Sequence, residues 1–289
     1  MNEKNLKPAS VFYYFEEICK VPRPSKREEK IIAYLKAFGR EHGLETKTDE
    51  VGNVLIKKPA TPGKENLKTV ILQSHIDMVC EKNSDVEHDF LIDPIETVVD
   101  GEWLKAKGTT LGADNGIGVA TELAILAATD IEHGPLECLF TVDEETGLTG
   151  AFALKPGFMT GDILINLDSE DEGELFIGCA GGANTTAEFT YQPVSAPQDY
   201  FYFRVAVKGL TGGHSGDDIN KGRANANKLL AIHAGLECGL FLEKYPSLDM
   251  VSFGPTLRGV HSPDERMLIP TVDKFWRHLL DVLVNIPTK

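Results

Sequence analysis

Hydrophobic and polar positions follow one pattern up to about residue 180 and a different pattern after it. In the first part, short apolar runs alternate with stretches whose apolar residues recur every three or four positions, as expected of strands and helices. The run Thr69–Ser74 (TVILQS) is apolar almost throughout, as in a strand buried on both faces. We expect helices at 9–20, 27–42, 115–128 and around 148–154, and strands at 45–48, 53–57, 69–74, 136–142 and 163–167.

Beyond residue 180, the segments 184–191 and 200–207 alternate apolar and polar residues, which predicts strands with one solvent-exposed face. Helices are expected at 220–232, 236–245 and 271–286, with a buried strand at 248–253. The succession of strands and helices predicts an α/β fold, a three-layer sandwich with a largely parallel, mixed sheet.

Length and composition narrow the class of protein. The chain has 289 residues, enough for one large or two moderate domains. It contains no stretch near the roughly 18 apolar residues that a membrane helix needs, and Met1–Ser10 lacks the apolar core of a secretory signal. With 44 acidic and 29 basic residues its formal charge is −15, which disfavours binding to nucleic acid. We therefore expect a soluble protein, with no nucleic acid and no membrane among its partners.

The five cysteines are widely spaced and form no CxxC pair, so neither a disulfide framework nor a thiolate zinc site is predicted. Three of them, Cys80, Cys138 and Cys179, lie in or beside apolar runs, as free cysteines do in a reducing compartment. The predicted localisation is cytoplasmic.

Four short motifs place acids or histidines at the ends of predicted strands, where open α/β sheets build their sites. In the first, Ser74–Val79 (SHIDMV), His75 and Asp77 are two residues apart and point the same way. A histidine there can ligate zinc, while the carboxylate orients a ligand or a catalytic group. By itself, this spacing also fits an ordinary polar strand end.

The second motif, Gly108–Gly118 (GTTLGADNGIG), puts Asp114 where a glycine-rich turn meets the start of a helix. The helix dipole and the unpaired backbone amides of the first turn would stabilise a carboxylate at this place. A simple helix cap is the alternative. The number of glycines favours a site, because small residues let the backbone approach an ion closely.

The third and fourth motifs contain acids directly after apolar strands. In Thr141–Gly147 (TVDEETG), one of the acids Glu144 and Glu145 can ligate a metal while the other reaches a bound water as general base. An exposed acidic loop is the alternative there. Asp168 follows the next strand, in Leu167–Glu170. Four such motifs in order, each after a strand, favour a common site over four separate coincidences.

Together with INLDSEDEGELFIGCAGG, GGHSGDDI and GPTLRGVHSPDERM, these motifs resemble those of the aminoacyl-histidine dipeptidases, also called peptidase D, Xaa-His dipeptidase or carnosinase. Those enzymes belong to the clan of co-catalytic zinc peptidases. The resemblance covers most of residues 1–260, and it implies a zinc-peptidase-like catalytic domain with an inserted lid.

The resemblance implies two zinc ions, and mixed imidazole and carboxylate ligation also allows manganese or cobalt as substitutes. Glu144 would be the general base, Asp77 would orient a ligand histidine, and the two ions would share a hydroxide. Only the resemblance points to His261, which reads locally as an ordinary loop residue. The implied ligands are His75 and Asp168 for one ion, Glu145 and His261 for the other, and Asp114 bridging both.

In the turn GLTGGHSGDD, His214 resembles a lid histidine that donates to the developing oxyanion, often from the partner subunit of a dimer. A polar turn residue is the alternative. A homodimer is therefore a candidate assembly, although a short lid would remove contacts that such a dimer needs.

The lid of this chain is predicted to be short. The lid-like segment 187–230 separates two parts of the catalytic domain, 1–186 and 231–289. A module of four strands and two helices needs roughly 70 residues, so this segment can hold only part of such a lid. We expect zinc binding to persist and dipeptide turnover to be weak or absent, because the lid normally clamps the substrate.

The leading hypothesis is a zinc dipeptidase that hydrolyses dipeptides with a free amino terminus. A preference for Xaa-His dipeptides, including β-alanyl-histidine, follows from the resemblance alone. A deacylase or a carboxypeptidase-like amidohydrolase would share the metal chemistry. The alternative from another class is a non-catalytic metal-binding or scaffold protein on a truncated peptidase fold. Glu144 separates the two classes, because hydrolysis needs a general base and a scaffold does not.

Overall fold

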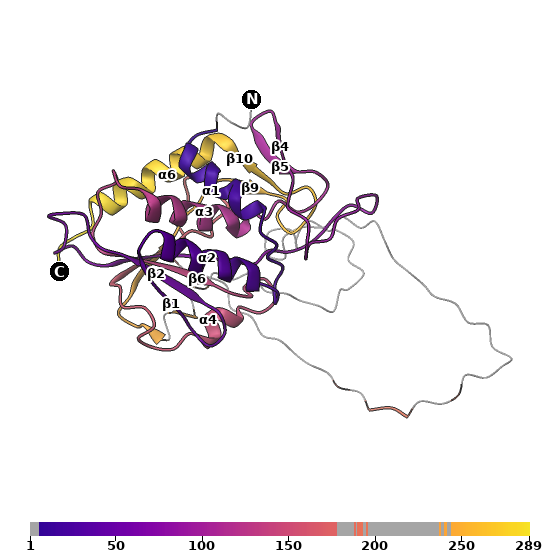
Figure 1. Cartoon of the computed structure of the whole chain (residues 1–289), viewed down its shortest axis with the longest axis horizontal. Helices are drawn as coiled ribbons and strands as arrows, with labels where there is room; N and C mark the ends of the chain where they lie inside the picture. Colours follow the sequence, from indigo (N-terminus) through magenta and orange to yellow (C-terminus); the bar gives the residue numbers. More distant parts are fainter. Residues whose placement is uncertain are drawn as a thin grey trace.

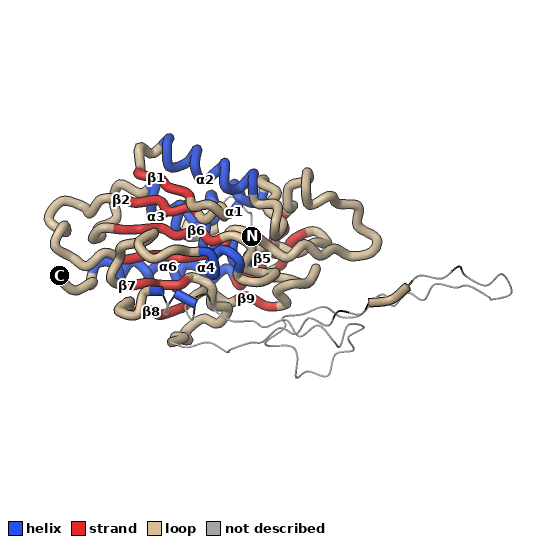
Figure 2. The backbone as a smooth tube through the Cα atoms, turned by 90° about the horizontal axis from the view of Figure 1, so that it is seen from below, coloured by secondary structure: helices blue, strands red, loops and turns tan. Residues whose placement is uncertain are grey.

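The computed structural model describes residues 6–177 and 244–289, together with 188, 190–192, 195, 237 and 240–241. Apart from these few positions, the predicted lid segment 187–230 lies outside the described residues, and so does His214. The described part is an α/β sandwich with one large and one small sheet (Figure 1, Figure 2). None of the described helices is both long enough and apolar enough to cross a membrane.

The large sheet has the strand order β1-β2-β6-β3-β7-β8. Its strands are β1 (Glu45–Thr48), β2 (Val54–Lys58), β3 (Val70–His75), β6 (Leu136–Thr141), β7 (Ile163–Asn166) and β8 (Asp249–Ser252). β3 is parallel to β6 and β7, and β7 is parallel to β8, whereas β2 is antiparallel to both β1 and β6. The prediction of a largely parallel, mixed sheet is confirmed.

Both faces of the large sheet are buried, because neighbouring residues of one strand enter two different hydrophobic clusters. On β3, Leu72 belongs to the cluster on one face and Ile71 to the cluster on the other. The first cluster packs under α1 (Ala9–Cys19), α2 (Glu29–Glu41), α3 (Ala113–Ala127) and α6 (Ile269–Val284), and the second under α4 (Thr149–Ala153) (Figure 1). All six residues of β3 are buried, as the run TVILQS predicts.

The small antiparallel sheet was not predicted. Its strands, in the order β4-β5-β10-β9, are β4 (Thr97–Asp100), β5 (Trp103–Ala106), β10 (Arg266–Leu268) and β9 (Leu257–Arg258). They have two to four residues each, with exposed or half-buried positions in every strand, so their apolar pattern is weak. This sheet brings the turn between β9 and β10 next to the segment that leads from β5 into α3.

Every element predicted within the two long described ranges, 6–177 and 244–289, is present, and its ends lie within two residues of the predicted ones. The expected helix at 236–245 lies largely outside the described residues, although Leu240, Phe241 and Lys244 are helical. The periodic pattern of the chain therefore predicts the large sheet and its helices closely.

Candidate metal centre

The five side chains predicted as metal ligands converge at the carboxyl ends of the parallel strands. They are His75 at the end of β3, Glu145 after β6, Asp168 after β7, Asp114 at the start of α3, and His261 in the turn between β9 and β10. Their side chains are buried or mostly buried, the most exposed being the imidazole of His261 at 20%. The two sheets thus contribute to one site.

The two carboxylate oxygens of Asp114 face different partners. Oδ1 lies 3.0 Å from Nε2 of His75, and the same nitrogen lies 3.5 Å from Oδ1 of Asp168. Oδ2 lies 3.1 Å from Nε2 of His261, and that nitrogen lies 2.9 Å from Oε2 of Glu145. Asp114 therefore lies between two pairs of donor atoms. One pair is Nε2 of His75 and Oδ1 of Asp168, and the other is Nε2 of His261 and Oε2 of Glu145.

These donor atoms suit a divalent transition metal, because zinc binds imidazole nitrogen and carboxylate oxygen. Ligand atoms of His75, Asp114 and Glu145 lie within 4.8 Å of one another, close enough to hold one ion. Oε1 of Glu145 is buried and has no hydrogen-bond partner among the described residues. A buried carboxylate oxygen without a partner is costly unless a cation or a proton compensates it. The residues present therefore fit a metal centre.

Burial raises the pKa values of some carboxyl groups of this site, whereas hydrogen bonds from the histidines lower the pKa of another. Burial raises the pKa of Asp168 to about 6, and it raises the pKa of Glu144 well above its ordinary value. Against the effect of burial, hydrogen bonds from the two histidines hold the pKa of Asp114 well below its ordinary value. Also against burial, Asp114 and Glu145 raise the pKa of His261 to about 11. Without a metal the site therefore retains protons that a cation would displace.

The metal-free chain is expected to lose stability as the pH rises from about 5 to about 8. Burial raises the pKa of Asp168 to about 6 and that of Glu237 to about 7, from ordinary values of 3.8 and 4.5. Both carboxyls bind a proton more tightly in the folded than in the unfolded chain, so their stabilising contribution is lost as the pH rises through these values. For Glu237 alone, the free energy of unfolding would fall by about 3 kcal/mol.

Urea unfolding in the presence of a chelator, at about pH 5 and about pH 8, measures this difference. His261 acts in the same direction, because its pKa is raised to about 11 and its contribution is lost as the pH rises above 6.5. Added Zn²⁺ should reverse the trend, since metal binding requires deprotonated ligands. A metal-free chain that is equally stable at both pH values would show that these groups are not shifted as described.

Asp77 joins His75 to the loop that carries the two adjacent acids. Its Oδ1 lies 3.3 Å from Nδ1 of His75 and accepts the backbone N–H of Glu144 at 3.0 Å. Its Oδ2 accepts the backbone N–H of Glu145 at 3.2 Å and the hydroxyl of Ser25 at 2.7 Å. One buried carboxylate thus sets the orientation of an imidazole and the position of the loop after β6. The exposed-loop alternative for this segment is wrong.

A second group of acids, Glu28, Asp77 and Asp143, lies nearby, but donors from the protein engage its oxygens. Oε1 of Glu28 accepts the backbone N–H groups of Lys26 and Asp143. The carboxylate of Asp143 accepts the hydroxyls of two threonines in its own loop. These hydrogen bonds stabilise turns around the site, so we assign this group a structural role.

The turn before α3 differs from the prediction in the partner of its backbone amides and in the residue that caps the helix. The backbone amides expected to stabilise Asp114 point instead at Glu265, whose two oxygens accept four consecutive N–H groups. The helix-cap alternative for Asp114 is also wrong, because the N-cap of α3 is Gly112 and the side chain that accepts a backbone N–H near the helix start, that of Gly118, belongs to Asn115. Asp114 turns its carboxylate to the two histidines.

Replacing Gly112 by alanine is expected to destabilise this turn. Gly112 has φ +68°, and a Cβ there would lie 2.6 Å from Nη2 of Arg23 and 2.8 Å from Sδ of Met78. The left-handed conformation costs an L-residue about 1–2 kcal/mol, and overpacking adds about 1–3 kcal/mol. Gly101→Ala is the control, since Gly101 has φ +63° and no atom within 4 Å of the added Cβ. Chemical denaturation should show the larger loss for Gly112→Ala, and equal losses would exclude the clash.

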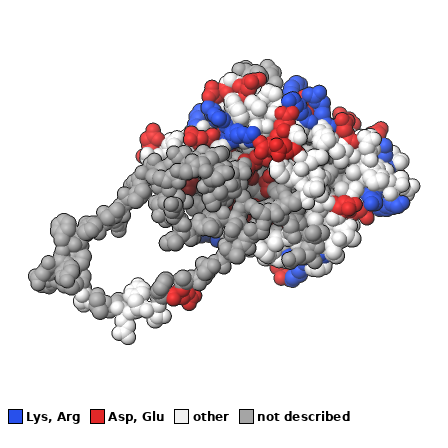
Figure 3. Space-filling view, turned by 180° about the vertical axis from the view of Figure 1, so that it is seen from behind, with Lys and Arg blue, Asp and Glu red and all other residues white. Residues whose placement is uncertain are grey.

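A separate cavity in the described part of the chain does not contain the candidate metal ligands. On the face drawn in Figure 3, acidic side chains gather near the middle. A cavity of about 490 Å³ lies at the amino ends of β3 and β6, lined among others by Lys57, Glu137 and Thr160. Glu137 there pairs with Lys57 and accepts hydrogen bonds from Thr160. None of the predicted metal ligands lines this cavity.

Sequence reasoning did not predict three buried charged residues beside the site, Arg23, Glu237 and Glu265. Glu237 accepts hydrogen bonds from Thr141 and Gln73, next to the strand ends that carry the candidate ligands. Its place in the apolar segment HAGLECGLF is a signal of burial that the sequence did contain. Glu265, between the charged residues Asp264 and Arg266, gives no such signal.

Comparison with known proteins places these observations in a family. The model of the peptidase family M20/M25/M40 matches residues 71–285. Over 225 residues the chain is 51% identical to the cytosol non-specific dipeptidase of Escherichia coli (strain K12), covering 78% of this chain and 46% of that protein. It is 29% identical over 200 residues to the uncharacterized protein YqjE of Bacillus subtilis (strain 168), covering 65% and 49%. The chain thus spans about half the length of these curated relatives.

Solved structures agree with this placement. The aminoacylhistidine dipeptidase from Vibrio alginolyticus matches with a TM-score of 0.81 and 32% sequence identity, covering 100% of this chain and 99% of that chain. A tripeptidase from Staphylococcus aureus subsp. aureus mu50 matches with a TM-score of 0.64 and 15% identity, covering 98% of both chains, which is a likeness of fold alone.

Proposed function

Since the chain belongs to the peptidase family M20/M25/M40, we propose that it is a metallopeptidase that hydrolyses dipeptides with a free amino terminus. The observation that carries this proposal is the position of Asp114, whose two oxygens face separate groups of one histidine and one carboxylate. Similarity to proteins named as dipeptidases in Escherichia coli and Vibrio alginolyticus supports the substrate class.

We propose zinc as the metal at both positions, with manganese or cobalt as substitutes. One position would be held by His75, Asp168 and Asp114, and the other by Glu145, His261 and Asp114. When bound, the two ions would polarise the scissile carbonyl and lower the pKa of a water molecule towards neutrality.

Glu144 is the proposed general base. It would take a proton from the attacking water as the new C–O bond forms, and pass it to the leaving amine as the C–N bond breaks. Burial raises its pKa, which suits a group that must both accept and release a proton. Asp77 would hold His75 and the backbone of Glu144 in place, and His214 would donate to the developing oxyanion.

Within the dipeptides, we propose Xaa-His substrates, including β-alanyl-histidine. The motifs quoted above and the likeness to the Vibrio alginolyticus aminoacylhistidine dipeptidase support this preference. Cytoplasmic localisation is proposed on the similarity to a protein named for the cytosol. The resemblance favours a homodimer in which His214 of one subunit would donate to the site of the other. A short lid would remove contacts that such a dimer needs.

We further propose a discontinuous catalytic domain, 1–186 and 231–289, around a shortened lid segment, 187–230. All five proposed ligands lie outside the lid segment, so we expect zinc binding not to depend on it. Turnover is expected to be weak or absent, because clamping of the substrate and the dimer contacts would come from the lid.

Metal analysis combined with hydrolysis assays on the purified chain tests both parts of the proposal. We expect two equivalents of tightly bound Zn²⁺ and slow cleavage confined to unblocked dipeptides. Faster cleavage of N-acylated substrates would identify a deacylase or carboxypeptidase-like amidohydrolase instead. A chain that takes up no zinc would refute the metal centre, whereas rapid turnover of Xaa-His dipeptides would refute only the expected effect of the short lid.

A non-catalytic metal-binding or scaffold protein is the second candidate. The short segment between the two parts of the catalytic domain favours it, because a truncated lid leaves the metal ligands in place while removing substrate contacts. The two candidates differ in their need for Glu144.

A further inference from the structure

We infer that Glu265 is a positioning residue that holds the turn of Asp114 against the loop of His261, so that the proposed metal positions are formed before a metal binds. The inference rests on the metal centre of the proposed function. It adds a residue that is not itself a ligand, and it can be tested in the absence of any metal.

Glu265 gathers the backbone amides of the turn that precedes α3. Its Oε2 accepts the N–H groups of Leu111 at 2.9 Å and Gly112 at 3.0 Å. Its Oε1 accepts those of Ala113 at 2.8 Å and Asp114 at 3.3 Å. Consecutive backbone N–H groups that converge in this way form an anion-binding concavity. Because Glu265 is only 2% exposed, its carboxylate cannot exchange these donors for water.

The backbone of Glu265 belongs to the same hydrogen-bonded loop as His261. The backbone N–H of Glu265 donates to the carbonyl of Ser262 at 3.0 Å, and the hydroxyl of Ser262 donates to the carbonyl of Gly259 at 2.6 Å. His261 itself has φ +60°, a conformation that non-glycine residues keep only where the surroundings impose it. Fixing Glu265 therefore helps to fix the backbone of the loop that carries the His261 imidazole.

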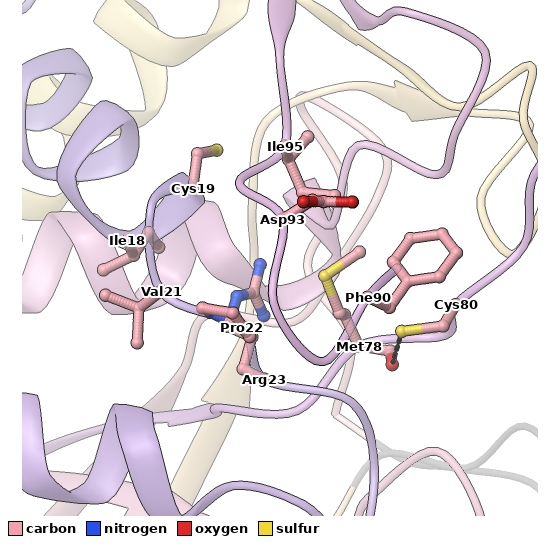
Figure 4. Close-up of a pocket in the computed structure, with 10 residues that line it drawn as sticks. All are labelled: Ile18, Cys19, Val21, Pro22, Arg23, Met78, Cys80, Phe90, Asp93 and Ile95. Carbon is pink, nitrogen blue, oxygen red and sulfur yellow. Dashed lines mark hydrogen bonds between the residues drawn. The ribbon is translucent and has the colours of Figure 1, made fainter. Parts of the chain in front are cut away.

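Arg23 holds the same turn from its opposite side. Its Nη2 donates to the carbonyl of Gly112 at 2.5 Å, while its Nη1 donates to the carbonyls of Ile76 and Asp77 at 3.2 and 3.0 Å. Figure 4 shows the guanidinium beside Met78, next to a cavity of about 10 Å³ that is too small for an organic ligand. The peptide at Gly112 thus links the loop of Glu265 to the end of β3.

Glu265→Gln is the sharpest change, because it keeps the size of the side chain while replacing one acceptor oxygen by a donor NH₂ group. That group would face two backbone N–H donors. Burial raises the pKa of Glu265 to about 7, so the comparison is made at about pH 8, where the parent side chain is ionised. Asp264→Asn is the matched control, since Asp264 is the exposed neighbour of Glu265.

The first measurement is amide hydrogen exchange on the metal-free chains. The amides of residues 111–114 should be protected in the parent and in Asp264→Asn, and should exchange about 10–100-fold faster in Glu265→Gln. Unprotected amides in the metal-free parent would overturn the inference without reference to any variant. Equal protection in parent and Glu265→Gln would overturn it as well.

The second measurement is titration of the same chains with Zn²⁺, with Co²⁺ absorption reporting the coordination geometry. Glu265→Gln should lose about 10–100-fold in affinity, chiefly at the position that contains His261. Changed exchange with unchanged affinity would overturn the positioning role. A parent that binds no metal would refute the proposed function, and the exchange experiment would still decide whether Glu265 holds the turn.

Discussion

Replacing Asp114 by alanine is expected to abolish tight binding of both metal ions. Each of its carboxylate oxygens faces a different histidine, at 3.0 and 3.1 Å, so Asp114 is the one proposed ligand that belongs to both positions. Affinity at each position should fall by more than about 100-fold, because changing residues that only orient metal ligands already costs about 10–100-fold. Hydrolysis, where the parent shows it, should disappear with the metal.

Zinc content after dialysis against a weak chelator measures this loss. Asp168→Ala provides the informative comparison, since Asp168 lies only in the group of His75, and one equivalent of zinc should remain. Asp130→Ala, an exposed acid beyond the other end of α3, should leave both equivalents in place. If Asp114→Ala still binds two zinc ions, the bridging assignment is wrong.

Glu144→Gln is expected to lower kcat by about 10²–10⁴-fold while zinc content stays that of the parent. The variant keeps the backbone N–H that donates to Asp77, so the loop after β6 should not move. It removes only the carboxylate that would accept and return the proton. KM should change little, because the proposed role of Glu144 lies in the chemical step.

Because turnover by this chain is expected to be slow, the assay follows released amino acid by mass spectrometry over long incubations at high protein concentration. Glu132→Gln is the control, as its side chain is 69% exposed. If the parent and Glu144→Gln cleave dipeptides at the same rate, Glu144 is not the general base. Zinc-loaded parent and variant that are both inert towards every dipeptide would favour the scaffold alternative.

The larger sheet could be predicted from the sequence because burial on both faces leaves a strong signal. The run TVILQS predicts β3, and all six residues of that strand, Val70–His75, are buried. β9, in contrast, has only the two residues Leu257 and Arg258, one buried and one exposed. A strand that short is specified by its partners across the sheet, so no local pattern could have revealed it.

For the candidate site, local chemistry predicted the residues that follow buried strands, such as His75 and Asp168. His261 lies in a hairpin turn of the smaller sheet, and only the resemblance to the dipeptidases pointed to it. Glu265 was missed because its burial depends on amides more than 150 residues earlier in the chain. The sequence pattern predicts that unpaired amides near the start of α3 stabilise Asp114, whereas the amides of residues 111–114 bind Glu265.

The place of His261 has a consequence for how the protein is made. Four of the five proposed ligands lie between residues 75 and 168, but the last, His261, comes from the hairpin of β9 and β10, more than 90 residues later. A ribosome adds residues from the amino end, so the nascent chain carries a cluster of acids long before the second imidazole emerges. The centre therefore cannot be completed until the hairpin of β9 and β10 has been synthesised, and a fragment that stops short of β9 would lack the second imidazole.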